Sequence, residues 1–370
     1  MSISNTILVC PLNWGLGHIS RDVPIIRRFK EKNFRVVVAG ALPVIDFIRY
    51  EFPTIETDFF PDFKVFYSKG NSQTLKLLSQ LPRALFSLYR EKKFTAKLVK
   101  KFNPVLIVSD NRYGVRHPNI KSIIITHQLM LKMPSNLKFL EKSSNRLIKY
   151  LVSKFDLCWI PDNPLPFTLS GDLVHKFPLP RNAKLIGPIS RFMDNFYKAE
   201  SDIKLKKYDL LVIISGPEPQ RTLFQQKLIA NFSEIPIKCL IVSGTLKKKS
   251  ESENLENIEI LPHLDTFSLA HYIKNTPIVV SRAGYTTIMD LWFLKKNAIL
   301  VPTPGQTEQE YIAEKTVVKN HFFVKQSKIA TFNFMQFSIN ENDNLQQNFV
   351  DNFLDKNITE ILNLCTEHFT

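Results

Sequence analysis

Two stretches in the C-terminal half place small, hydroxyl-bearing and acidic residues where a strand gives way to a helix. The first reads VVSRAGYTTIMD, residues 279 to 290. Its apolar run ends at Val280, Gly284 lies at the turn, and Asp290 follows within the expected helix. Backbone amides at such a helix start can bind a phosphate. A carboxylate only accepts hydrogen bonds, which suits the two hydroxyl donors of a ribose. This stretch therefore predicts a nucleotide site.

The second stretch reads LVPTPGQTEQEYIAEK, residues 300 to 315. Another apolar run ends here, and a proline-glycine loop leads to Thr307, which we expect to be the N-cap of a helix. Gln306 and Gln309 lie on the same rim, and their amides both donate and accept hydrogen bonds, as sugar hydroxyls do. Capping and turn chemistry would explain each feature alone. The two stretches in this order favour a nucleotide-sugar site.

A third stretch, Asn-Trp-Gly-Leu-Gly-His at residues 13 to 18, follows the first apolar run of the chain. It nearly matches the dinucleotide fingerprint, but Ser20 stands where the third glycine belongs. No acidic residue ends the next strand, which reads VVVAGAL. Both departures argue against a nicotinamide or flavin site. The pattern still predicts a tight loop and a helix start that attracts an anion, with His18 directed into a cleft.

Three residues that follow expected strands could act as a general base toward an attacking hydroxyl. His18 is the first candidate, Asp110 in VSDNRYG is its rival, and His127 in ITHQ is the third. The sequence contains no D-x-D motif, and we expect no metal or other cofactor. Helix starts and arginines would then stabilise the charge that develops on a leaving diphosphate.

Short apolar runs must position these residues. They recur along the chain, and apolar residues at helical spacing follow the first of them at residues 18 to 32. Strands that alternate with helices in this way predict parallel sheets covered on both faces. We therefore expect an α/β protein with two doubly wound, Rossmann-like domains that face each other across a cleft. The expected strands are 6–12, 34–39, 105–109, 123–126, 157–160, 210–214, 238–242, 258–261, 278–280, 298–301 and 322–324.

The composition changes between residues 190 and 207, where a polar and charged segment without a clear period predicts a linker. We place an acceptor-side domain at residues 1–195 and a nucleotide-sugar-binding domain at 196–370. A return of the C-terminal helix to the first domain stays open.

The composition is that of a globular protein, with 370 residues, 44% of them hydrophobic. The cysteines are far apart in the sequence and suit buried thiols in a reducing compartment: Cys10, Cys158, Cys239 and Cys365. With no secretory signal pattern and no spanning apolar stretch, we expect a cytoplasmic protein, possibly peripheral on the inner face of the membrane.

The formal net charge is +15, and much of the excess is concentrated in residues 76–101 and 132–154. Lys and Arg alternate there with Leu, Phe and Tyr. Basic residues beside an apolar stripe suit an anionic membrane surface, although two ordinary helices with solvated basic faces would have the same pattern. No nucleic-acid-binding motif is present, and we expect no nucleic-acid partner.

The C-terminal motif SRAGYTTIMD…VPTPGQTEQEYIAEK resembles the nucleotide-binding signature of the GT-B glycosyltransferases. It is most similar to glycosyltransferase family 28, the family of the N-acetylglucosaminyltransferase that makes the lipid-linked peptidoglycan precursor. The motifs also follow the family's order. They are Gly15 to His18, Ser215-Gly216, Arg282 to Asp290 and Pro304 to Tyr311.

The resemblance assigns a role to individual residues. Asp290 would bind the ribose, where the family usually has Glu, and Leu264 would border the uracil. Arg221 would compensate for the prolines of SGPEPQR, which lack amide donors. The donor-site residues are Ser215, Gly216, Arg221, Leu264, Arg282, Gly284, Tyr285, Thr286, Asp290, Gln306 and Gln309. The acceptor-site residues are Asn13, Trp14, Gly15, Gly17 and His127, and His18 and Asp110 would be catalytic.

The activity that the resemblance implies is metal-independent, inverting transfer of an N-acetylhexosamine or hexose from a UDP-sugar to a hydroxyl acceptor. A lipid-linked sugar or another cell-envelope glycan precursor would fit as acceptor. Two alternatives stay open. One is a UDP-sugar epimerase or hydrolase with the same fold, and the other is a non-catalytic binder of anionic surfaces.

Overall fold

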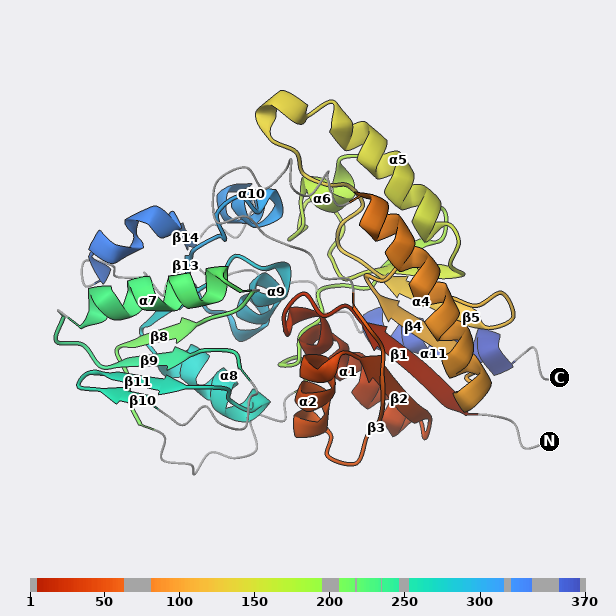
Figure 1. Cartoon of the computed structure of the whole chain (residues 1–370), viewed down its shortest axis with the longest axis horizontal. Coiled ribbons are helices and arrows are strands. Elements are labelled where there is room, and N and C mark those ends of the chain that lie inside the picture. The colour runs from red at the N-terminus through yellow and green to blue at the C-terminus, as the bar shows by residue number, and fades with distance from the viewer. Residues whose placement is uncertain are drawn as a thin grey trace.

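The computed structural model describes two lobes, each built on one sheet (Figure 1). The described residues are 5–62, 81–194, 206–216, 218–233, 235–245, 253–315, 321–334 and 353–366. Most of the predicted linker, residues 195–205, lies outside them, as do residues 76–80 of the first basic segment.

The N-terminal lobe has a seven-stranded sheet in the order β3-β2-β1-β4-β5-β6-β7, with every neighbouring pair parallel. Its strands are β1 (Thr6–Pro11), β2 (Arg35–Gly40), β3 (Glu56–Phe59), β4 (Leu106–Asp110), β5 (Lys121–Ile125), β6 (Leu157–Ile160) and β7 (Ala183–Leu185). The described helices of this part of the chain are α1 (Gly17–Glu31), α2 (Leu42–Glu51), α4 (Leu81–Phe102), α5 (Leu140–Val152) and α6 (Asp172–His175), with a short 3-10 helix η1 (Ser135–Leu137).

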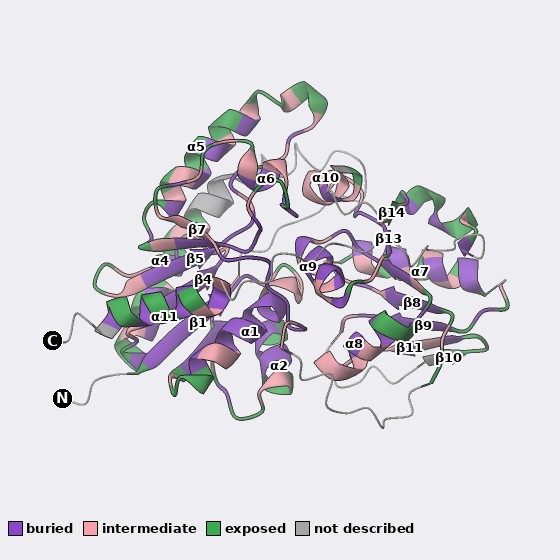
Figure 2. Ribbon diagram, turned by 180° about the vertical axis from the view of Figure 1, so that it is seen from behind, coloured by how far each residue is buried: buried purple, intermediate pink, exposed green. Residues whose placement is uncertain are grey.

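Strand β1 shows why its residues are apolar without interruption. Ile7 and Val9 belong to the buried cluster that contains α1 residues, while Leu8 and Cys10 belong to the cluster that contains α4 residues. A strand covered on both faces has no side that can be polar. Figure 2 shows the resulting buried strands between partly exposed helices.

The C-terminal lobe repeats this architecture with the strand order β10-β11-β9-β8-β12-β13-β14. Only the edge pair β10–β11 is antiparallel among these pairs. The strands are β8 (Leu210–Ile213), β9 (Cys239–Val242), β10 (Glu253–Leu255), β11 (Ile258–Leu261), β12 (Ile278–Ser281), β13 (Ile299–Leu300) and β14 (Phe322–Phe323). The helices are α7 (Gln220–Phe232), α8 (Thr266–Asn275), α9 (Tyr285–Leu294) and α10 (Thr307–Lys315), with the 3-10 helix η3 (Gln326–Thr331).

The last described helix, α11 (Phe353–Thr366), lies with the N-terminal lobe (Figure 1). It contacts α1, and Asp355 accepts a hydrogen bond of 2.9 Å from Arg28 Nε. The same buried apolar cluster contains Ile358 and Ile361 of α11 together with core residues of both lobes. The end of the chain therefore stabilises the first lobe.

The prediction of two doubly wound parallel sheets is confirmed, and each predicted strand is present with ends that differ by at most two residues. Three edge strands, β3, β7 and β10, were not predicted. An edge strand pairs on one side only and needs no continuous apolar sequence, so ETDF and AKL carry no strand signal. All four cysteines are free and buried, as expected.

Candidate functional site

In each sheet the strand order reverses between two neighbouring strands. Several of the predicted site residues come directly after these strands. In the N-terminal lobe these strands are β1 and β4, and in the C-terminal lobe they are β8 and β12. Loops that leave the carboxyl ends of neighbouring strands there run in opposite directions and leave room for a ligand. The topology therefore brings the loop of residues 12–16, Asp110, Ser215-Gly216 and Arg282–Gly284 to the two facing edges.

Two glycine loops meet between the lobes. A Cβ atom placed on Gly15 would lie 3.8 Å from the backbone nitrogen of Gly216. Both glycines have positive φ, +103° and +100°, which disfavours any residue with a side chain. A Cβ on Gly17 would lie 3.3 Å from Thr286 Oγ1, which donates a 3.0 Å hydrogen bond to the Gly17 carbonyl.

Two helices, the one that follows the Gly15 loop and the one that follows the Arg282–Gly284 turn, also meet at their N-terminal ends. Helix α1 begins at Gly17 and α9 begins at Tyr285, and the two helices contact one another (Figure 1). Neither N-cap residue, Leu16 or Gly284, provides a side-chain hydrogen bond to the helix. Both helix starts therefore keep free N–H groups and a positive dipole end, which favour a bound anion.

His18 and Asp110, two of the candidate bases, are partners. His18 Nδ1 lies 3.1 Å from Asp110 Oδ1. Arg21 approaches both carboxylate oxygens of Asp110, with Nε 2.8 Å from Oδ2 and Nη2 in contact with Oδ1. Burial raises the pKa of Asp110, but the charges of Arg21 and His18 outweigh it and hold this pKa well below the ordinary value. Asp110 is therefore a carboxylate that orients His18.

His127 lies on the other side of Arg21 and contacts the C-terminal lobe. Its Nδ1 is 3.0 Å from Arg21 Nη1, and its Nε2 is 2.8 Å from Glu308 Oε1. Its ring stacks on Tyr285 with the centroids 4.2 Å apart. Burial lowers the pKa of His127 against the opposing effect of Glu308. Both ring nitrogens are thus engaged, whereas His18 has only its Nδ1 bonded within the described part of the chain.

The sequence analysis missed Arg21, Asp22 and Glu308. Arg21 and Asp22 stand three and four residues after His18, so they lie on the same face of α1, and this spacing was a usable signal. Asp22 is buried, and its carboxyl group is a hydrogen-bond partner of Asp110. Burial and the neighbouring Asp110 raise its pKa well above the ordinary value, so Asp22 is a neutral acid beside the Arg21–Asp110 pair.

Asp290, the predicted ribose ligand, lies at the junction between the lobes. Its Oδ1 accepts a hydrogen bond from Ser190 Oγ. Burial raises its pKa to about 6, although Arg191 and the Ser190 hydroxyl act in the opposite direction. The guanidinium of Arg191 is buried, with no hydrogen bond to Nε or Nη1 in the described residues, and its nearest carboxylate is Glu51 at 3.7 Å. A positive charge that is paired with Glu51 but lacks hydrogen bonds at two of its nitrogens in the described residues therefore lies beside Asp290.

Two predicted donor-site arginines have partners within the C-terminal lobe. Arg282 is 1% exposed and donates to the carbonyls of Val301, Pro302 and Gln220. Burial lowers its pKa to about 9. It therefore joins the ends of β12 and β13 to α7. Arg221 is paired with Glu218, so it has a competitor for any phosphate.

The loop before α10 lies against the N-terminal lobe. Thr307 is the first residue of the helix instead of its N-cap, and its Oγ1 donates to the Lys132 carbonyl at 2.6 Å. Gln309 Oε1 accepts from the Thr303 backbone at 2.8 Å, which shapes the loop that contains Gln306. Leu264 is partly buried against the core beside α8.

On the acceptor side, Asn13 provides hydrogen bonds to Asp62, and the Trp14 side chain is 40% exposed. Tyr285 donates its hydroxyl hydrogen to the carbonyl of Pro161 at 2.8 Å.

Across the described residues, no group of three His, Cys, Asp or Glu side chains is arranged to hold a metal ion. None of the described helices is long and apolar enough to span a membrane.

Known proteins with a similar sequence or a similar fold are glycosyltransferases. The family model described as "Glycosyltransferase family 28 C-terminal domain" matches residues 211–333. The C-terminal lobe is therefore similar to the C-terminal domain of the family 28 glycosyltransferases. The structure of the calicheamicin glycosyltransferase CalG4 is similar with a TM-score of 0.60 and 11% identity, over 99% of both chains. The fold of the chain is GT-B.

Two curated relatives extend the likeness. An uncharacterized glycosyltransferase of Methanosarcina mazei is 25% identical over 228 residues, and the match spans 58% of each chain. A UDP-N-acetylglucosamine–N-acetylmuramyl-(pentapeptide) pyrophosphoryl-undecaprenol N-acetylglucosamine transferase of a Sulfurihydrogenibium species is 22% identical over 293 residues. That match covers 78% of this chain and 75% of the relative.

The raised pKa of Asp290 predicts an unusual pH dependence of stability. The folded protein holds the Asp290 proton up to pH about 6, whereas the unfolded chain releases it near 3.8, so ionisation between these values costs stability. We expect Asp290→Asn to raise the free energy of unfolding by about 1–3 kcal/mol above pH 7. The difference should vanish below pH 4 in urea titrations at both pH values. An equal or lower stability of the variant at pH 8 would contradict the assignment.

Proposed function

We propose that the protein is a glycosyltransferase that moves a sugar from a UDP-sugar to a hydroxyl acceptor. The single observation that carries the proposal is the His18–Asp110 pair, held by Arg21 beside the point where the N-terminal ends of α1 and α9 meet. One side of this arrangement can take a proton, and the other can stabilise a leaving diphosphate. The family 28 domain supports the donor class.

The leaving group would be stabilised without a metal. The free amides of the α1 and α9 starts and the buried guanidinium of Arg191 supply positive potential where the diphosphate charge grows. Asp290 would accept hydrogen bonds from the ribose, and Gln306 and Gln309 would contact the sugar.

His18 would act as the general base. With the proton of the neutral ring on Nδ1, directed at the Asp110 carboxylate 3.1 Å away, Nε2 would carry the lone pair that accepts the acceptor's proton. As that proton moves to Nε2, the acceptor oxygen forms a bond to the anomeric carbon. The bond from this carbon to the phosphate oxygen breaks, and UDP leaves with the bonding electrons. One displacement of this kind inverts the anomeric centre.

We infer the classes of donor sugar and acceptor from the name of the Sulfurihydrogenibium relative. Its name specifies UDP-N-acetylglucosamine as donor and an undecaprenol-linked acceptor. We therefore propose an N-acetylhexosamine or hexose as the sugar, and a lipid-linked sugar or another cell-envelope glycan precursor as the acceptor.

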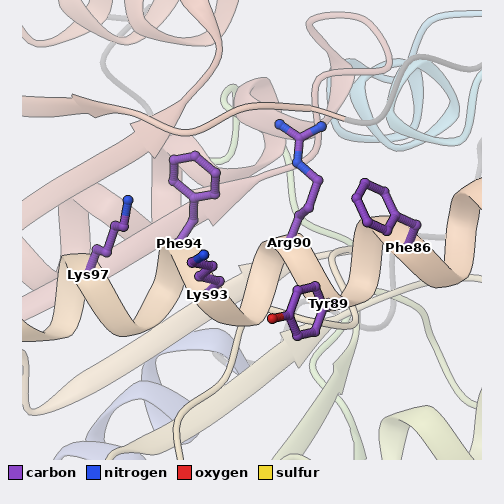
Figure 3. A pocket seen from close by; sticks show the side chains of 6 residues that line it. All are labelled: Phe86, Tyr89, Arg90, Lys93, Phe94 and Lys97. Carbon is purple, nitrogen blue, oxygen red and sulfur yellow. The ribbon is translucent and has the colours of Figure 1, made fainter.

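A basic and aromatic surface on α4 and α5 supports a membrane-bound acceptor. On α4, Phe86 and Tyr89 are 62% and 64% exposed. With Arg90, Lys93, Phe94 and Lys97 they line a hollow of about 400 Å³ (Figure 3). On α5, Leu147 and Tyr150 are exposed beside further basic residues. Exposed rings among cations suit the interface of an anionic bilayer.

The ribose assignment predicts a binding defect. Replacing Asp290 with Ala should weaken UDP binding by about 1–3 kcal/mol, because buried hydroxyls lose their acceptor. Isothermal titration at pH 8 measures this. Ser190→Ala is the matched control, since it removes the hydroxyl on Oδ1 but keeps the carboxylate. In wild type, binding should weaken as the pH falls below about 6, because protonation removes the acceptor. Unchanged UDP affinity in Asp290→Ala would refute the assignment.

The base assignment predicts a loss of turnover without a loss of donor binding. We expect His18→Ala to lower kcat by about 10²–10⁴-fold and to keep its UDP affinity. Asp110→Asn should also lower kcat, because the carboxylate that orients His18 is lost. Transfer to an acceptor that survives in His18→Ala would make Asp110 the base. Free sugar or an epimer from a UDP-sugar alone would indicate a hydrolase or epimerase instead.

The membrane surface predicts selective binding to anionic vesicles. The double variant Lys93→Glu, Lys97→Glu should bind phosphatidylglycerol vesicles at least tenfold more weakly than wild type. Each lysine near an anionic surface contributes about 1 kcal/mol to the binding free energy, and the variant loses two. Leu255→Ser, at an exposed apolar residue of the C-terminal lobe, is the control and should bind normally. Equal binding of all three proteins in sedimentation would exclude α4 as the contact.

A further inference from the structure

A continuous chain of buried and partly buried polar contacts crosses between the lobes and ends at His18. It runs from Glu308 on α10 to His127, from His127 to Arg21, and from Arg21 to Asp110 and His18. Only Glu308 belongs to the C-terminal lobe. The chain is therefore complete only when α10 lies against the N-terminal lobe, as it does here.

The contacts fix the protonation of His127. Arg21 Nη1 can only donate, so His127 Nδ1 must accept, and the single ring proton must sit on Nε2. That proton donates to Glu308, whose pKa is lowered by His127 against the effect of burial. His127 is thus neutral, with its tautomer set from two sides. It has no lone pair left to take a proton from a substrate.

The same contacts hold Arg21 in place. Its Nε and Nη2 bond Asp110, and its Nη1 needs the acceptor that His127 offers. If His127 turned or changed tautomer, Arg21 Nη1 would lose its partner while buried, which costs free energy that only a rearrangement can recover. Arg21 also lies 3.1 Å from His18 through Nη2, so a shift of Arg21 would move Asp110 and His18 together.

We propose that the Glu308–His127 contact senses closure of the two lobes and orients His18 through Arg21 and Asp110. This inference rests on the proposed function. Glu308 and His127 are then positioning residues, and the base is set for proton transfer only while α10 is docked.

The position of Glu308 links this contact to the donor. Glu308 lies between Gln306 and Gln309, the two residues proposed to contact the donor sugar. Other interlobe contacts of the same elements support the docking, such as the Thr307–Lys132 hydrogen bond and the Asp172 amide that donates to the Tyr311 hydroxyl at 2.7 Å. A donor that draws α10 inward would therefore set the base at the same time.

Acid should break the contact from the His127 side. The groups that face His127 are Arg21 and His18 of α1, Glu308 of α10 and Tyr285 of α9. A second proton on His127 would sit on Nδ1, against a guanidinium that can only donate. Protonation would thus release Arg21 even though it strengthens the bond to Glu308.

The test compares Glu308→Gln with Glu308→Ala. Both variants remove the same charge, but glutamine keeps an oxygen that can accept the His127 Nε2 proton, so the difference between them reports the hydrogen bond. We expect kcat at least tenfold lower in Glu308→Ala than in Glu308→Gln, with UDP affinities within about threefold of each other. Glu314→Ala, at an exposed residue of the same helix, is the control with normal kcat.

A second measurement does not depend on transfer activity. Nitrogen-15 spectra of the histidine side chains should show His127 as the Nε2–H tautomer and a protected proton on His18 Nδ1, in wild type and in Glu308→Gln. Glu308→Ala should lose the His18 signal. These spectra without any sugar transfer would refute the proposed function but keep the coupling. Equal kcat and equal spectra in the two Glu308 variants would overturn the inference. It would also be overturned if the effects of Glu308→Ala and His127→Ala on kcat, expressed as free energies, were fully additive in the double variant.

Discussion

The buried ion pair of Arg21 and Asp110 is the constraint on which the site depends. Neither side chain is exposed by more than 1%, and a buried charge without a partner costs several kcal/mol. The pair therefore fixes α1 against the end of β4. Because His18 precedes Arg21 by one helical turn, the same pairing puts His18 beside the carboxylate. The geometry of the candidate base is thus a consequence of a charge that must be neutralised inside the protein.

The topology explains why the facing lobe can complete this site. Both sheets reverse their strand order, and the helices that begin next to those points, α1 and α9, meet at their N-terminal ends. Like dipole ends repel one another, so their approach favours an anion between or beside them. The glycines at 15 and 216 allow the backbones to come close. A bound diphosphate would offset the repulsion between the two positive helix ends that the fold brings together.

The sequence was sufficient for the fold and for the individual candidates, but not for their connections. Apolar runs located the strands because a strand buried on both faces has no polar alternative. His18, Asp110 and His127 were found because each follows such a run. That Arg21 joins all three could be inferred only partly, from its spacing on α1. Glu308 could not be found, because its partner is 181 residues away and depends on how the lobes meet. Arg282 was predicted as a donor-site residue, yet it donates to three carbonyls that no local pattern reveals.

Several ionisable groups in this region are held at a cost to stability. Burial raises the pKa values of Asp22 and Asp290, and two nitrogens of the Arg191 guanidinium have no hydrogen bond in the described structure. A protein selected for stability alone would replace such groups with apolar ones. All three lie beside the His18 pair or at the lobe junction. Similar costs occur elsewhere, since burial also raises the pKa values of Glu91 and Asp62, although both carboxylates are paired with Arg112. A ligand bound at the lobe junction would give hydrogen-bond partners to Asp290 and Arg191 and would so recover part of this cost.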